Sequence, residues 1–139
     1  MKVVIVGLDD LAVVDMSKNL ASTLGFKCLN FDSEFEKVLL TSKDYPLIEI
    51  DVLLERKEKM LIEYILKFDD IVLAISNNSY LSNENYKLFK DDVTICVEKE
   101  ENEKILKNLQ NLIKKHCKIS INQQNYDISM LIDEIKKYY

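Results

Sequence analysis

The chain has 139 residues, of which 47% are hydrophobic and 31% charged, a composition typical of one globular domain. Its 24 acidic and 19 basic residues give a net charge of −5, which provides no long-range attraction for nucleic acid or an anionic membrane. The chain holds two glycines, one proline and one arginine, too few for a glycine-rich phosphate loop or a site with several arginine clamps.

Short apolar runs alternate with helical patterns along the chain, which predicts a parallel sheet covered by helices. We expect strands over residues 2–6, 27–31, 70–75, 93–97 and 117–121. Apolar residues at helical spacing predict helices over residues 13–24, 35–39, 51–66, 82–90, 100–115 and 128–135. The predicted fold class is therefore α/β: a single domain over residues 1–139, with helices on both faces of a five-stranded parallel sheet.

Several residues mark the ends of these elements. Gly25 stands where the C-terminal cap of the first helix belongs, and Asp127 is placed as the N-cap of the last helix. The segment 76–79 is read equally well as a polar pocket floor or as a simple turn. We interpret the charged run 98–104 as the solvated start of the helix that follows.

The cysteines and the histidine predict no special chemistry. Cys28, Cys96 and Cys117 are odd in number and fit no zinc-binding spacing, so we expect reduced core thiols and no metal site. His116 has no second ligand and no nucleophile partner in the pattern, and we expect a surface residue. Apolar runs are too short to span a membrane and no signal-peptide pattern is present, which favours a cytoplasmic protein.

Polar residues follow several of the predicted strands. In an open parallel sheet ligands bind beyond the carboxyl ends of the strands. The candidates for a site are therefore residues 7–14, 30–32 and 76–79, and the segments after Val97 and Ile121. Asp32 is interpreted either as a substrate contact or as a helix N-cap.

The sequence resembles the shikimate kinases, small P-loop enzymes that phosphorylate shikimate with ATP. The resemblance covers nearly the whole chain, in order and without insertions up to the fourth strand. It is carried by V-I-V-G (4–7), L-A-x-x-L-G (20–25), N-F-D-S-E-F-E (30–36), I-V-L-A (71–74), S-Y-L-S-N-E-N (79–85) and V-T-I-C-V (93–97). It implies a three-layer P-loop fold with strand order 2-3-1-4-5.

The resemblance also places the phosphate loop on residues 7–14, and there the sequence departs from the family. Gly7 is retained, but the phosphate-binding lysine falls on Val13 and the magnesium-binding hydroxyl on Val14. Asp9 and Asp10 put carboxylates where phosphate would lie. At about 6 Å and an effective dielectric constant of 20, each carboxylate repels each phosphate charge by roughly 3 kcal/mol. We therefore expect both aspartates to cap the first helix, with neither ATP nor magnesium as a cofactor.

The substrate side implied by the resemblance is also altered. Of the family's two aspartates after the second strand, the substrate-contacting one falls on Asp32, and its arginine in the third helix falls beside Arg56. The family's triple glycine becomes Ser76, Asn77 and Asn78, and its lid arginines have no counterpart. The remnant substrate site would hold Asp32, Arg56, Asn77 and Asn78.

The sequence predicts a shikimate-kinase-like protein without catalytic residues that binds a small polar metabolite or another protein, such as a partner enzyme. One alternative is an active shikimate kinase of aromatic amino-acid biosynthesis, which uses ATP and magnesium in a rebuilt site. A second is a receiver-like signalling module, based on L-I-E-I-D (47–51) and A-I-S (74–76) with Asp51 as phosphate acceptor. The oligomeric state stays open.

Overall fold

The computed structural model describes residues 1–40 and 50–139, which form one five-stranded parallel sheet of order β2-β3-β1-β4-β5. The strands are β1 (Lys2–Gly7), β2 (Lys27–Asn30), β3 (Ile71–Ala74), β4 (Val93–Glu98) and β5 (Ile119–Asn122). The predicted strand number, direction and order are confirmed.

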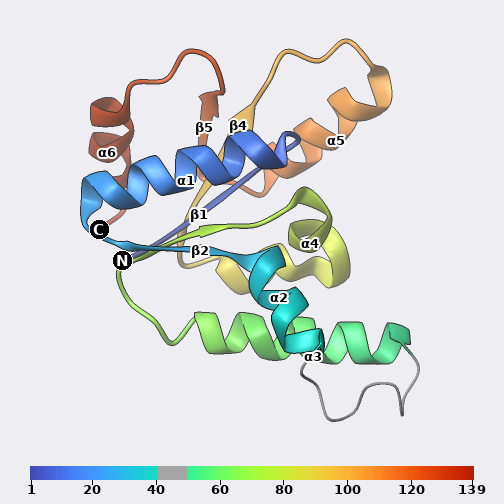
Figure 1. Cartoon of the computed structure of the whole chain (residues 1–139). Coiled ribbons are helices and arrows are strands. Elements are labelled where there is room, and N and C mark those ends of the chain that lie inside the picture. The colour runs from blue at the N-terminus through green and yellow to red at the C-terminus, as the bar shows by residue number, and fades with distance from the viewer. Residues whose placement is uncertain (41–49) are drawn as a thin grey trace.

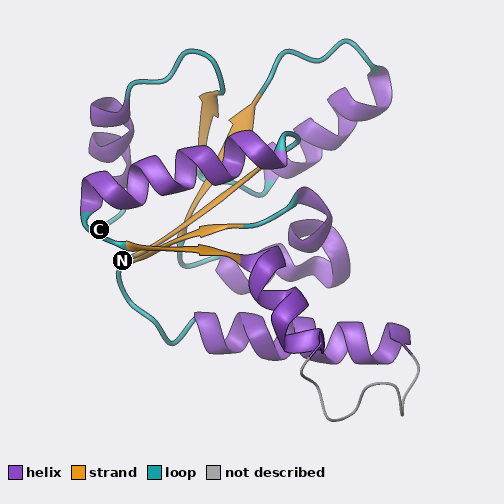
Figure 2. Cartoon of the chain, viewed as in Figure 1, coloured by secondary structure: helices purple, strands orange, loops and turns teal. Residues whose placement is uncertain are grey.

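Helices cover both faces of this sheet, so the molecule has three layers (Figure 2). They are α1 (Asp10–Leu24), α2 (Phe31–Leu40), α3 (Ile50–Ile65), α4 (Asn77–Leu81), the 3₁₀ segment η1 (Ser82–Phe89), α5 (Lys104–Lys115) and α6 (Ile128–Lys136). Helices α1 and α6 lie on one face, and α3 and α4 lie on the other (Figure 1).

The alternating side chains of β1 divide the core into two halves. Val3 and Ile5 point into the half beneath α1 and α6, while Val4 and Val6 point into the half beneath α3, α4 and α5. All four are buried, which explains why the strand is a continuous β-branched run instead of an apolar and polar alternation.

Each of the two glycines is required at its position for a different structural reason. Gly25 is left-handed at φ 72° and caps α1, donating its N–H to the carbonyls of Ala21 and Ser22, as the sequence predicted. At Gly7, a Cβ would lie 2.6 Å from the carbonyl oxygen of Val97, so no larger residue fits where β1 approaches β4. The other predicted cap is also confirmed, because Asp127 accepts hydrogen bonds from the N–H groups of Ser129 and Met130.

The charged run 98–104 does not begin a helix, contrary to the prediction. Glu98 ends β4, residues 99–103 form a loop, and α5 begins at Lys104. The carboxylate of Glu101 accepts hydrogen bonds from the N–H groups of Asn102 and Glu103, both at 3.1 Å. This local capping competes with helical hydrogen bonds and delays the helix.

The region after the third strand also differs from the prediction. Residues 76–79 begin the short helix α4, and the helix expected at 82–90 is a 3₁₀ segment with Asn83 and Glu84 in left-handed conformation. The buried amide of Asn85 donates hydrogen bonds to the carbonyl oxygen of Ser79 and to Glu58, which holds the chain in this kinked path. Smaller differences lie in β2, which ends at Asn30, and β5, which starts at Ile119.

The topology excludes a receiver-like arrangement. The doubly wound fold of receivers has strand order 2-1-3-4-5, whereas β3 here lies between β2 and β1. Asp51 belongs to helix α3 instead of ending a strand, and residues 47–49 of the proposed motif lie outside the described residues.

The remaining residues considered in the sequence lie as follows. The three cysteines are free thiols, with Cys96 buried and Cys28 and Cys117 half-buried. His116 is half-buried instead of exposed, because its ring stacks on Tyr86 with 3.7 Å between centroids. Among the described residues, no helix is both long and apolar enough to cross a membrane.

Candidate functional site

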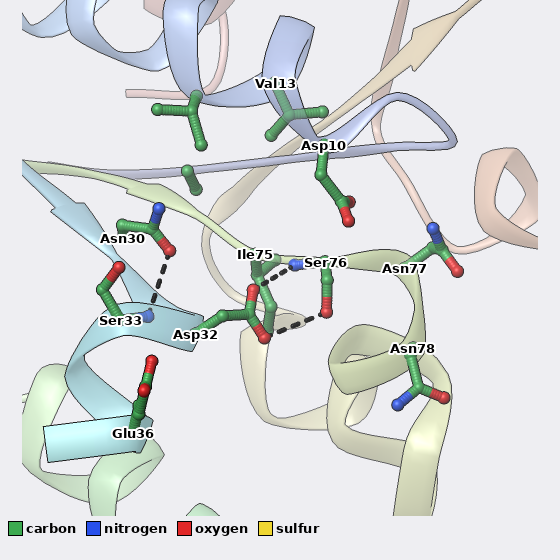
Figure 3. A pocket seen from close by; sticks show the side chains of 12 residues that line it. Asp10, Val13, Asn30, Asp32, Ser33, Glu36, Ile75, Ser76, Asn77 and Asn78 are labelled. Atoms are coloured by element: carbon green, nitrogen blue, oxygen red, sulfur yellow. Dashed lines mark hydrogen bonds between the residues drawn. The ribbon is translucent and has the colours of Figure 1, made fainter. Parts of the chain in front are cut away.

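A cleft of about 440 Å³ opens beyond the carboxyl ends of β1, β2 and β3 (Figure 3). This is the edge where parallel sheets place their ligands. Its walls come from the start of α1, the β2–α2 junction and the β3–α4 junction. The lining residues are Asp10, Val13, Val14, Asn30, Asp32, Ser33, Glu36, Ala74, Ile75, Ser76, Asn77 and Asn78.

Asp32 organises the floor of this cleft. Its carboxylate accepts hydrogen bonds from the backbone N–H of Ser76 at 3.0 Å, the Ser76 hydroxyl at 3.1 Å and the Ser79 hydroxyl at 2.9 Å. The Ser76 hydroxyl in turn accepts from the N–H of Ser79 at 3.2 Å. Asp32 therefore supports the N-terminus of α4, while Asn30 caps Asp32's own helix by accepting from the N–H of Ser33.

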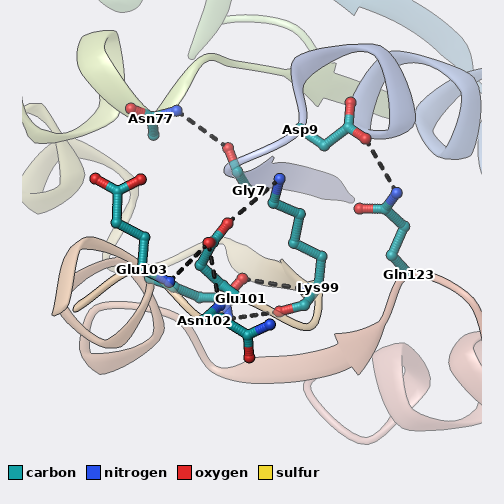
Figure 4. Close-up of polar contacts among 9 residues, drawn as sticks. Gly7, Asp9, Asn77, Lys99, Glu101, Asn102, Glu103 and Gln123 are labelled. Atoms are coloured by element: carbon teal, nitrogen blue, oxygen red, sulfur yellow. Dashed lines mark hydrogen bonds and ion pairs between the residues drawn. The ribbon is translucent and has the colours of Figure 1, made fainter. Parts of the chain in front are cut away.

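Asp9 closes the turn between β1 and α1 (Figure 4). One carboxylate oxygen accepts from the N–H of Ala12 at 3.2 Å, and the other accepts from the side-chain amide of Gln123 at 3.0 Å. The Ala12 hydrogen bond, then Gln123, and more weakly the charge of Lys99 hold the pKa of Asp9 below its usual value. The predicted capping role of Asp9 is thus confirmed, and both of its oxygens are engaged within the protein.

Two further contacts surround this turn in Figure 4. The side-chain amide of Asn77 donates to the carbonyl oxygen of Gly7 at 3.3 Å, which ties the start of α4 to the end of β1. On the other side, Lys99 forms an ion pair with Glu101 at 3.6 Å, within the loop 99–103. The turn is therefore flanked by polar side chains from three separate segments.

Asp10 begins α1 and points toward the cleft, across from Asp32 (Figure 3). Partial burial raises the pKa of Asp10, and the negative charges of Asp32 and Asp9 raise it further. Glu36 adds a third carboxylate to the lining, and no lysine or arginine is among the described lining residues. The cleft is consequently acidic and repels anions.

A second cavity of about 520 Å³ adjoins the first and shares Asp32 and Asn78 with it. Its lining adds Phe35, Leu54, Glu55, Glu58, Ser79, Ser82 and Asn83. Glu58 is buried, and the loss of water around its carboxylate raises its pKa. The two neighbouring cavities together are lined by five carboxylates: Asp10, Asp32, Glu36, Glu55 and Glu58.

The structure brings most of the predicted site residues together. Asp10, Val13 and Val14 face Asp32, Asn77 and Asn78 across the first cavity, with Gly7 and Asp9 in the adjoining turn. Arg56 is exposed on α3 and lines neither cavity. The sequence did not single out Glu36, Glu58 or Gln123, although Gln123 belongs to the candidate segment after Ile121. Helical spacing of Glu36 four residues after Asp32 could have indicated the first, but the other two depend on distant contacts.

Neither a protein-family model nor a curated protein matches the sequence. Solved structures do match. A shikimate kinase from Acinetobacter baumannii in complex with shikimate superposes with TM-score 0.71 at 15% identity, over 98% of this chain and 90% of that chain. This chain has the shikimate kinase fold.

Two other solved shikimate kinases agree. The enzyme from Bacteroides thetaiotaomicron gives TM-score 0.67 at 10% identity, covering 99% of this chain and 97% of that one. The enzyme from Aquifex aeolicus gives TM-score 0.58 at 14% identity, covering 99% and 95%. The match to the shikimate kinase fold thus covers nearly the whole chain, and the cleft lies at the strand ends where this fold class binds ligands.

Proposed function

We propose that this shikimate-kinase-like protein is non-catalytic and that its acidic cleft binds a small polar metabolite that is neutral or positively charged. The observation that carries the proposal is the charge of the lining: Asp10, Asp32 and Glu36 are present without a lysine or arginine among the described lining residues. A hydroxyl-rich or amine-bearing ligand can donate hydrogen bonds to such carboxylates.

The residues at the phosphate-loop position do not fit ATP with magnesium. An anion site at a helix start needs free N–H groups and benefits from a lysine. Here the carboxylate of Asp9 already accepts from the N–H of Ala12, and the apolar Val13 and Val14 line the cleft. A phosphate would therefore meet a fixed negative charge instead of a positive one.

A shikimate-type anion is disfavoured for the same reason. The Acinetobacter structure contains shikimate, a ring acid whose carboxylate needs a cationic partner. In this chain Arg56 is exposed and lines neither cavity, and the carboxylates of Asp10 and Glu36 would oppose the acid.

A thermal-shift titration tests the proposal. Magnesium with ATP, and shikimate, are expected to leave the melting temperature unchanged, whereas a library of uncharged polyols and amino polyols should contain a stabilising compound. Stabilisation grows with ligand concentration and reaches about 2.7 kcal/mol at 100 times the dissociation constant. Glu36→Gln should weaken binding of an amine-bearing hit, while Glu63→Gln, exposed on α3 outside both cavities, should not.

The proposal fails if the purified chain phosphorylates shikimate with magnesium and ATP. It also fails if anionic ring acids, but no neutral or cationic compounds, raise the melting temperature.

A further inference from the structure

A groove of about 260 Å³ runs along the outer edge of β2, separate from the acidic cleft. Three consecutive β2 residues and residues of α3 line it, so the groove lies between the outer edge of the strand and the helix beside it. Within the described residues, no strand pairs with this edge of β2. The groove is lined by Lys27, Cys28, Leu29, Glu34, Leu61, Tyr64, Ile65 and Phe68.

One wall of this groove, formed by α3 and the connection that follows it, is aromatic and exposed. Tyr64 is 57% exposed and Phe68 37% exposed, and their rings meet edge to face with 5.1 Å between centroids. Met60, one turn before Tyr64 on the same helix, is 52% exposed. Tyrosine, phenylalanine and methionine are enriched in protein interfaces, and a free strand edge offers unpaired backbone groups beside them.

The two ends of the groove carry opposite charges, so two copies related by a two-fold axis would bring opposite charges together. Lys27 begins β2, and Glu34 lies in the first turn of α2, four residues after the strand ends, where it also forms a solvent-exposed ion pair with Lys37 at 3.5 Å. When two copies of a strand pair antiparallel, the start of each lies beside the end of the other. Lys27 of each copy then faces Glu34 of the other copy, and the contact forms twice.

We propose that the β2 edge pairs antiparallel with β2 of a second copy of this chain, forming a symmetric dimer with one continuous sheet. Tyr64 and Phe68 of both copies pack across the axis, and the two Lys27–Glu34 pairs fix the register. The acidic cleft stays open, because it lies at the strand carboxyl ends and shares no lining residue with the groove.

The opposite sheet edge is less suited to this pairing. The groove along β5 is lined by polar Ser120 and Asn122 and by Lys118, whose ammonium lies over the Tyr138 ring at 5.7 Å from its centroid. Ser120 donates its hydroxyl hydrogen bond to Glu98 within the chain. Among the large apolar residues of that groove, only Met130 is strongly exposed.

Sedimentation equilibrium with charge-reversed variants tests the dimer. The wild-type chain should show a concentration-dependent dimer. Lys27→Glu alone and Glu34→Lys alone should each raise the dimer dissociation constant by at least about tenfold, because both symmetric contacts become like-charge pairs. An equimolar mixture of the two variants should restore dimerisation as a heterodimer, since each contact then joins opposite charges. Lys107→Glu on the exposed side of α5 is the control and should leave the dimer unchanged.

Unchanged melting temperatures would show that the variants fold, and deuterium exchange locates the interface. The amides of Cys28 and Asn30 should become protected as the wild-type concentration rises, because they alternate with the Lys27 amide, which donates to Asp70 on the β3 side. A wild-type chain that stays monomeric up to about 1 mM overturns the proposal, because its dimer dissociation constant would then exceed about 1 mM. It is equally overturned if the mixture does not dimerise when the wild type does, or if residues 119–122 are protected instead.

Discussion

At the residue scale, two carboxylates that line the cavities also stabilise the fold. Asp32 connects α2 to the start of α4, which lies 44 residues further along the chain. Glu58 on α3 is 9% exposed and accepts a hydrogen bond from the side-chain amide of Asn85 in η1. Its burial raises its pKa above the ordinary value of 4.5, so its ionised form is disfavoured in the folded chain.

Glu58→Gln should therefore stabilise the protein at pH 7, because the amide oxygen can accept the Asn85 hydrogen bond without a buried charge. A raised pKa contributes stability that is fully present below the unfolded value of 4.5 and lost as the pH rises through the folded value. The advantage of Glu58→Gln over wild type should accordingly shrink as the pH falls through the folded value toward 4.5, and it should not change further below 4.5. Urea unfolding at several pH values measures it. A stability difference between Glu58→Gln and wild type that does not depend on pH would contradict this role.

At the element scale, the sequence predicts the end of a helix best when a neighbouring residue caps it. Gly25 and Asp127 cap α1 and α6 through neighbours within four residues, so their types and positions suffice. Asp9 belongs to the same class with respect to Ala12, although its second partner Gln123 is 114 residues away. The loop 99–103 was missed because the capping of Glu101 and the helical pattern are both local and compete.

Asp9→Ala should cost about 1 kcal/mol of stability, the usual effect of losing an N-cap. Asp15→Ala, on the exposed face of the same helix, should cost far less. Because the pKa of Asp9 is lowered, its contribution is present above 3.8 and is lost as the pH falls through the folded value. Denaturant unfolding at neutral and acidic pH measures both effects. Equal costs for the two variants at neutral pH would rule out the capping role.

At the scale of the whole molecule, the sheet separates two cores that share its backbone. Ile5 lies in the core under α1 and α6, and Ile62 lies in the core under α3, α4 and α5; both are fully buried. Since every strand contributes side chains to one or both halves, we expect the halves to unfold together.

Ile5→Val and Ile62→Val should each destabilise the protein by about 1 kcal/mol. The double variant should lose the sum of the two within about 0.5 kcal/mol, because the side chains lie on opposite faces of the sheet and do not touch. Urea unfolding followed by far-ultraviolet circular dichroism and by tyrosine absorbance should give one transition. Two separated transitions would show that the halves fold independently.

The sequence by itself determined the α/β class, the positions of the five strands and the caps Gly25 and Asp127, because these depend on apolar periodicity and on neighbours within one helical turn. Only the tertiary structure decided the partners of Asp32, the burial of Glu58 and the outward position of Arg56. It likewise decided that β2 carries an open edge beside exposed aromatic residues. The physical reason is that these properties arise from contacts between segments far apart along the chain. A local sequence pattern does not show which distant segments come into contact.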